Sequence, residues 1–240
     1  MRAELVRLFN FAAMYFQAKF RCVFPFLVLL ILLFSGCFEI VEDVTIHKNG
    51  SGTFLYTINL SQSKNQIDGL MKLDSSDGYR VPQRKEIDAS ILKAKTTIEK
   101  SPGISNVSTN NDWTNYIFTL KFDFNSVNNL NLAVETVSQE LASDHKRIPE
   151  ASDNFAFTGT QFDRKSHYDA KTQAPKLSAK DKEILRTASY TCIYRFDDFV
   201  NTCSNKDSKI SKSGKAVMTK LNMLDLASGQ KSIINKVTLK

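Results

Sequence analysis

The feature that most constrains this chain is a short apolar run near its N-terminus, Cys22–Phe34. The run has thirteen residues, whereas a membrane-spanning helix needs about 20. Basic residues precede the run and small residues follow it, which is typical of the hydrophobic region of a secretory signal. We therefore predict that residues 1–36 are a signal peptide and take no part in the fold. The true start is predicted at Met14, which gives a leader of ordinary length.

A cysteine stands at the predicted cleavage point. The residues Phe34-Ser35-Gly36-Cys37 resemble a bacterial lipobox, with Phe34 in the place where Leu is usual. The resemblance implies that a signal peptidase recognises Phe34, Ser35 and Gly36, that the Cys37 sulfur carries diacylglycerol, and that a fatty acid such as palmitate acylates the new amino end. A single acyl chain anchors a protein in a membrane only marginally, at ~0.8 kcal/mol per buried methylene, whereas two or three acyl chains anchor it durably. The alternative is an uncleaved anchor with an incidental cysteine.

The charge of the chain lies partly in the leader. The whole sequence has 32 Lys and Arg against 25 Asp and Glu, and four of the basic residues and one acidic residue precede Cys37. The remaining 28 basic and 24 acidic residues give only a mild positive charge, so we predict no nucleic-acid partner. The 204 residues from Cys37 onward suit one domain with a real core.

Alternating apolar residues and turn signals predict an α+β fold, in which antiparallel sheets built from hairpins carry helices on one side. The pattern predicts hairpins at 38–60 and 104–124, helices at 62–73, 83–100 and 127–142, and strands near 155–162, 188–196, 200–209, 215–223 and 232–239. Residues 167–178 are predicted to be a loop. We expect a hairpin-helix part at 37–142, an irregular connection at 143–187, and a β-rich part at 188–240 packed on the same domain.

The strand pairs, Gly-Ser turns and late Phe-rich strand of this pattern resemble uncharacterised envelope lipoproteins of Gram-negative bacteria. The pattern is also similar, more distantly, to the exported domain of the mycobacterial LppM-type lipoproteins. The resemblance covers most of the chain after Cys37, and it implies a lipoprotein of the cell envelope without bringing any catalytic residue.

Two cysteines remain beyond the lipid position, Cys192 and Cys203. In an oxidising compartment such a pair is a disulfide candidate. If 190–196 and 199–203 formed a hairpin with its turn at Asp197-Asp198, the two cysteines would face each other within bridging distance. The alternative is that no bridge forms, because the pair would stand at a hydrogen-bonded position with less comfortable geometry.

Few residues in this sequence indicate a catalytic or metal-binding site. The three histidines, His47, His145 and His167, are scattered and predict no metal site, and no nucleophile motif of the Gly-x-Ser-x-Gly type is present. We therefore predict no catalytic residues and no cofactor. Trp113 stands in a polar hairpin tip and is a candidate for contact with a partner, although it can equally fold back on its own hairpin.

Together these features predict a non-enzymatic envelope lipoprotein, anchored in a membrane through lipid on Cys37, whose α+β module binds a partner protein or an envelope component such as a glycolipid. The alternative hypothesis is a carrier of lipid or of a small apolar ligand, which would require a cavity above about 300 Å³. Phe38, rather than Asp, follows the lipid cysteine, and this favours the periplasmic side of the outer membrane over the inner membrane.

Overall fold

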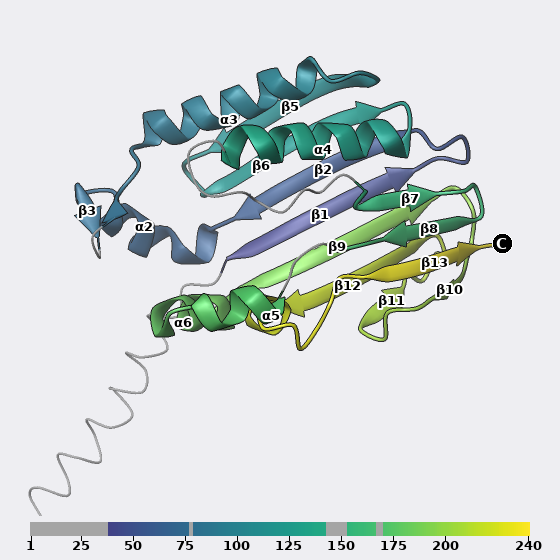
Figure 1. Ribbon diagram of the computed structural model, residues 1–240. Coiled ribbons are helices and arrows are strands. Elements are labelled where there is room, and N and C mark those ends of the chain that lie inside the picture. The colour runs from purple at the N-terminus through teal and green to yellow at the C-terminus, as the bar shows by residue number, and fades with distance from the viewer. Residues whose placement is uncertain (1–37, 77–78, 143–152, 167–169) are drawn as a thin grey trace, which may run out of the picture. The chain divides into compact units, whose positions relative to one another are not determined.

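A seven-stranded sheet forms the centre of the structure (Figure 1). The structure is a computed structural model, and it describes residues 38–76, 79–142, 153–166 and 170–240. Gly36–Lys240 form one compact unit, so the folded part is described by itself. The predicted signal peptide, the lipobox, His145 and His167 lie outside the described residues.

The large sheet has the order β11-β12-β9-β1-β2-β6-β5. Its strands are β1 (Glu39–Ile46), β2 (Gly52–Asn59), β5 (Ile104–Asp112), β6 (Ile117–Phe124), β9 (Ser189–Phe196), β11 (Ser208–Ile210) and β12 (Ala216–Asn222). Neighbouring strands are antiparallel except β1 and β9, which are parallel. The first hairpin forms as predicted, with Gly50 at φ +81°, a backbone conformation that glycine adopts easily.

Alternation of side chains gives the large sheet one apolar face. Val44, Phe54, Phe122 and Tyr194 all point to this face and are almost completely buried. The opposite face carries polar side chains and ion pairs, among them Arg195 with Asp43 at 2.8 Å. The apolar face is therefore the one on which the other elements pack.

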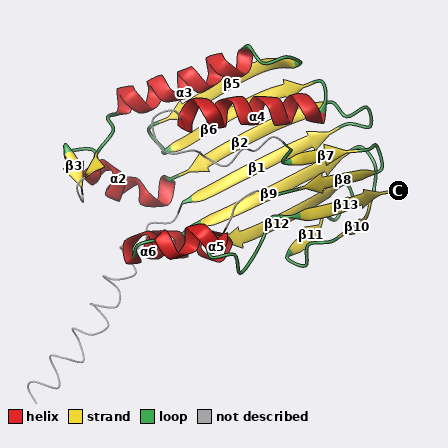
Figure 2. Ribbon diagram, in the orientation of Figure 1, coloured by secondary structure: helices red, strands yellow, loops and turns green. Residues whose placement is uncertain are grey.

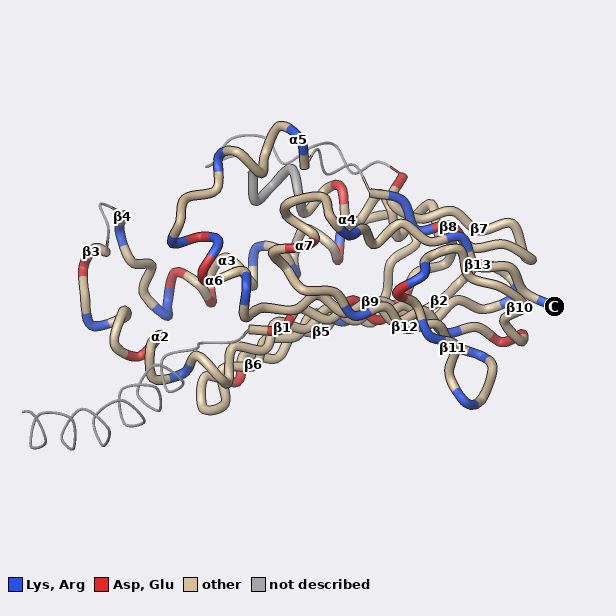
Figure 3. Tube along the Cα trace, turned by 90° about the horizontal axis from the view of Figure 1, so that it is seen from below, with Lys and Arg blue, Asp and Glu red and all other residues tan. Residues whose placement is uncertain are grey.

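Helices cover one half of the apolar face, and a second sheet covers the other half (Figures 2 and 3). Helices α3 (Arg84–Glu99) and α4 (Val127–Ala142) lie over β2, β6 and β5. A second sheet, of order β10-β13-β8-β7, covers the β9 side with β7 (Phe155–Phe157), β8 (Gln161–Arg164), β10 (Val200–Cys203) and β13 (Asn235–Leu239). Phe162 of this sheet packs against Tyr194, with ring centroids 4.8 Å apart. The predicted α+β fold with helices on one side of antiparallel sheets is confirmed.

Shorter elements connect these layers. They are the 3₁₀ helices η1 (Ser61–Ser63) and η2 (Ala174–Lys176), the helices α2 (Lys64–Leu70), α5 (Ala170–Gln173), α6 (Ala179–Thr187) and α7 (Met223–Ala227), and the strands β3 (Ser75–Ser76) and β4 (Tyr79–Arg80). Helix α6 begins with a capping box formed by Ser178 and Asp181. The elements α5 and η2 lie within 167–178, so part of the loop predicted there is helical.

The predicted pairing of 190–196 with 199–203 is wrong. Strand β9 pairs with β12, so that Cys192 stands opposite Thr219, whereas β10 leaves the large sheet and pairs with β13. The strand predicted at 200–209 is consequently divided between the two sheets as β10 and β11. The alternation of apolar residues in 199–203 is compatible with pairing to β9 or to β13. Pairing with β13 buries Val200 and Val237 between the two sheets.

Candidate functional site

An apolar cavity of about 540 Å³ lies between the large sheet, α2 and α3. It is lined by Tyr56, Ile58, Leu60, Ile67, Leu70, Met71, Val81, Pro82, Ile87, Ile91, Ala94, Trp113, Tyr116, Phe118, Thr119, Leu120 and Val137. This volume falls within the range of about 300–1,000 Å³ that is typical of small-molecule sites. The cavity is the candidate functional site.

The sequence builds this cavity from two periodic patterns. Ile58 of β2 and Phe118 of β6 stand opposite each other on the apolar face. Ile87, Ile91 and Ala94 of α3 share one side of the helix because they are spaced by about one turn. The methyl group of Ala94 fills less of the space between helix and sheet than a larger apolar side chain would, so the helix and the sheet enclose a hollow there.

A polar cluster stands at one side of the cavity. The Arg84 guanidinium donates to the Tyr116 hydroxyl at 2.9 Å and to the Asp68 carboxylate at 3.1 Å, and the Tyr116 hydroxyl also donates to Asp68. The guanidinium carbon of Arg84 lies 5.2 Å from the centre of the Trp113 ring, which is a cation–π distance. These contacts tie α2, α3 and the hairpin of β5 and β6 together.

Trp113 folds back on its own hairpin. Its ring meets Phe118 edge-on at a centroid distance of 4.8 Å, and its indole nitrogen donates to Asp88 at 3.0 Å. Of the two alternatives for Trp113, the structure has the one in which the side chain folds back on its own hairpin, and there it lines the cavity. Tyr116 follows at φ +57°, an unfavourable conformation for tyrosine that is held by its full burial and by its bonds to Arg84 and Asp68.

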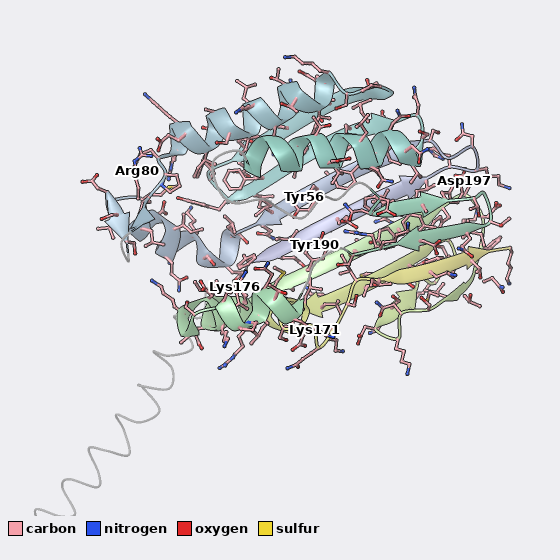
Figure 4. The ribbon with its side chains drawn as sticks, viewed as in Figure 1. Tyr56, Arg80, Lys171, Lys176, Tyr190 and Asp197 are labelled. Atoms are coloured by element: carbon pink, nitrogen blue, oxygen red, sulfur yellow. The ribbon has the colours of Figure 1, made fainter. Side chains whose placement is uncertain are left out.

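A second cavity of about 300 Å³ continues the first toward the centre of the sheet. Both cavities are lined by Tyr56, Leu120 and Val137. Tyr56 and Tyr190 come from the strands on either side of β1 and line this inner cavity (Figure 4). Burial raises the pKa of Tyr56, so its hydroxyl stays protonated. Glu42, Asn154 and Arg164 also line the inner cavity, so its lining is more polar than that of the outer one.

Comparison with known proteins gives only a faint similarity. No protein-family model matches the sequence, and no curated protein matches it either. Among solved structures, the folded domain of the LppM protein of Mycobacterium tuberculosis, determined by NMR, aligns with 86% of this chain and 92% of its own chain. The sequence identity is 11% and the TM-score is 0.40. At that level the similarity supports no statement about the site.

The two predicted disulfide cysteines are free thiols in different sheets. Cys192 is completely buried on β9, and Cys203 is half-buried on β10. Burial raises the pKa of the Cys192 thiol strongly, and the nearby Glu42 carboxylate adds to this. Of the two alternatives that the sequence left open, the unbridged one holds, because the hairpin that would bring the two sulfurs together does not exist.

The remaining candidates are separate from the cavity. Asp197 accepts a hydrogen bond from His47 at 3.1 Å and another from the backbone of Lys48, so the predicted turn at Asp197-Asp198 is tied to the first hairpin. Across the part of the chain that the structure describes, no three His, Cys, Asp or Glu side chains are grouped as metal ligands would be. The described helices include none with the length and hydropathy to cross a membrane.

Proposed function

We propose that this protein is a non-enzymatic lipoprotein of the cell envelope, whose domain binds the apolar chain of a lipid or a similar small ligand in the cavity beneath α3. The cavity carries the proposal, because two adjoining spaces of about 540 and 300 Å³ lie where a tightly packed core would otherwise be. Among the described residues no comparable feature favours a partner protein, so we prefer the carrier to the partner-binding module.

The lining indicates the class of ligand. The outer cavity is surrounded almost entirely by aliphatic and aromatic side chains, which favour a hydrocarbon chain at about 0.8 kcal/mol per buried methylene. Polar contacts are available deeper in, because Tyr56 lines both cavities and Glu42 and Arg164 line the inner one. A single-chain or branched amphiphile, such as a fatty acid or the acyl part of a glycolipid, fits this combination.

The anchor is part of the same proposal. Lipid on Cys37 would hold the domain against a membrane, on the periplasmic side of the outer membrane rather than at the inner membrane, and the ligand would then be available in the same leaflet. The mass of the N-terminal peptide of membrane-extracted protein tests this anchor. A peptide that begins at Cys37 and carries diacylglycerol is expected, and it should be missing in C37A. An unmodified peptide beginning at Met1 or Met14 would contradict it.

The cavity is tested with a photoreactive fatty acid and the full chain in lipid nanodiscs. We expect cross-links in the peptides of α3 and β6, and quenching of Trp113 fluorescence by a brominated fatty acid, since Trp113 is the single tryptophan of the chain. The variant A94F should fill the cavity and abolish both signals. Leu92 lies on the exposed side of the same helix, 61% accessible, so L92F is the matched control and should keep them. Cross-links that are unchanged in A94F would overturn the proposal.

A further inference from the structure

One end of the large sheet begins directly after the predicted membrane anchor in the sequence. Phe38 is the first described residue, and its carbonyl accepts a hydrogen bond from the Ser189 backbone at 3.0 Å. Glu39 is paired with Asn59 on one side and with Ser189 on the other. The start of β1, the end of β2 and the start of β9 therefore share this end, which we call the anchor end.

The sequence places a membrane close to the anchor end. The apolar run ends at Phe34, four residues before Phe38. An extended residue spans at most about 3.6 Å, so Phe38 is held within roughly 15 Å of that run. A lipid on Cys37 would be closer still. Both forms of the anchor, cleaved or uncleaved, lead to the same orientation.

Exposed apolar side chains belong to the elements at this end. Figures 1 and 3 show α2 and α6 there, and Figure 4 shows Lys176 there as well, with Asp197 at the opposite end. Leu70 and Leu73, at and after the end of α2, are 43% and 47% accessible, and Ile184 of α6 is 47% accessible. Exposed apolar side chains that gather at one end of a domain can mark a surface that meets a membrane or a partner.

The segment from α5 to α6 carries an excess of positive charge. It has Lys171, Lys176, Lys180, Lys182 and Arg186 against Asp181 and Glu183. A lysine near an anionic leaflet contributes about 1 kcal/mol of binding. Apolar side chains between lysines are the composition of a surface that rests in a membrane interface.

We propose that the anchor end docks on an anionic membrane leaflet, with Leu70, Leu73 and Ile184 in the interface and the lysines of α5–α6 over the lipid headgroups. This inference rests on the proposed function only for the membrane anchor. Because Leu70 and Met71 also line the cavity, docking brings the wall formed by α2 against the leaflet. A lipid chain can then pass from the leaflet to the cavity with little exposure to water.

Hydrogen exchange tests the docking on the full chain in nanodiscs of phosphatidylcholine, with and without 30% phosphatidylglycerol. On the anionic discs we expect slower exchange in peptides covering 64–73 and 179–187 and no change at 47–51 and 211–215. The double variant K171E/K182E should remove this difference, with the ratio of docked to undocked protein falling about fivefold for each lysine. The control K209E/K212E reverses two exposed charges elsewhere and should keep it.

Several results would overturn the docking. They are equal exchange at 64–73 and 179–187 on both kinds of disc, protection at 47–51 and 211–215 instead, or an effect of K209E/K212E as large as that of K171E/K182E. Fatty-acid cross-linking in the cavity is measured separately on the same variants. Loss of docking with intact cross-links would contradict this inference alone, whereas intact docking without cross-links would contradict the carrier.

Discussion

Arg164 and Glu42 form a buried, doubly hydrogen-bonded ion pair between the two sheets. The guanidinium donates from Nε to Oε1 at 3.0 Å and from Nη2 to Oε2 at 2.9 Å, although 122 residues separate the two in the chain. The hydroxyls of Tyr190 and Tyr194 donate to the same carboxylate at 3.0 and 2.8 Å. Burial alone would lower the pKa of Arg164, but the charge and hydrogen bonds of Glu42, together with the neighbouring Tyr194 and Tyr190, outweigh this and raise it.

Removal of one partner of this pair should be far more costly than removal of both. R164M leaves a buried carboxylate with two tyrosine donors and no counter-charge, and it should lower the free energy of unfolding by about 3–5 kcal/mol. The double variant E42L/R164M leaves no buried charge, so it should lose less stability than either R164M or E42L alone. Urea unfolding measures all three, and a loss below about 1 kcal/mol for R164M would contradict a buried, paired charge.

Cys192 should be inert in the folded protein. Its raised pKa and complete burial keep the thiol protonated and inaccessible, so iodoacetamide at pH 8 should modify it only after denaturation. Peptide mass spectrometry after native labelling measures this, with denatured protein as the control. Under non-reducing conditions both Cys192 and Cys203 should be recovered as thiols, and a bridged peptide would contradict the placement of β10 in the second sheet.

Two glycines should respond to alanine in opposite directions. A Cβ at Gly52 would lie 1.9 Å from the Thr45 carbonyl oxygen and 2.6 Å from the Phe124 ring, so G52A should cost about 1–3 kcal/mol or more. A Cβ at Gly69, in α2, would meet nothing within 4 Å, and G69A should stabilise by about 0.5–1 kcal/mol. Thermal unfolding compares the two. A stabilising G52A would show that β1 and β2 do not approach this closely.

Asp123 should make a small contribution to stability that disappears in acid. Its carboxylate accepts hydrogen bonds from Asn106 and Thr53, both at 2.7 Å, and these lower its pKa from the usual 3.8. A lowered pKa in the folded state gives stability that is fully present above the unfolded value and is lost as the pH falls through the folded value.

The variant D123N measures this contribution. Because the site is largely open to solvent, the difference in unfolding free energy from the wild type should stay within about 1 kcal/mol above pH 5. It should shrink between pH 4 and pH 2. Urea unfolding at three pH values measures it, and a difference that grows in acid would contradict the sign.

Much of the fold could be predicted because it depends on neighbours in the chain. The hairpin of β1 and β2 follows from alternation on both sides of Asn49 and Gly50, and α3 follows from the spacing of Ile87, Ile91 and Ile98 and from the stop at Gly103, which has φ +70°. The sequence shows that Trp113 is an unusual residue in a polar hairpin tip, but nothing local indicates that Asp88 and Phe118 hold it.

The sequence by itself determined which residues of the longer strands and helices face the interior, where those longer elements lie, and that a short apolar run precedes the domain by a few residues. Only the tertiary structure decided that β9 lies parallel to β1, that β10 joins a second sheet, and that Glu42 meets Arg164. It also decided the cavity. Periodicity shows that Tyr56 or Ala94 faces inward, but the space between them depends on how closely two layers from distant parts of the chain approach, and no local pattern contains that distance.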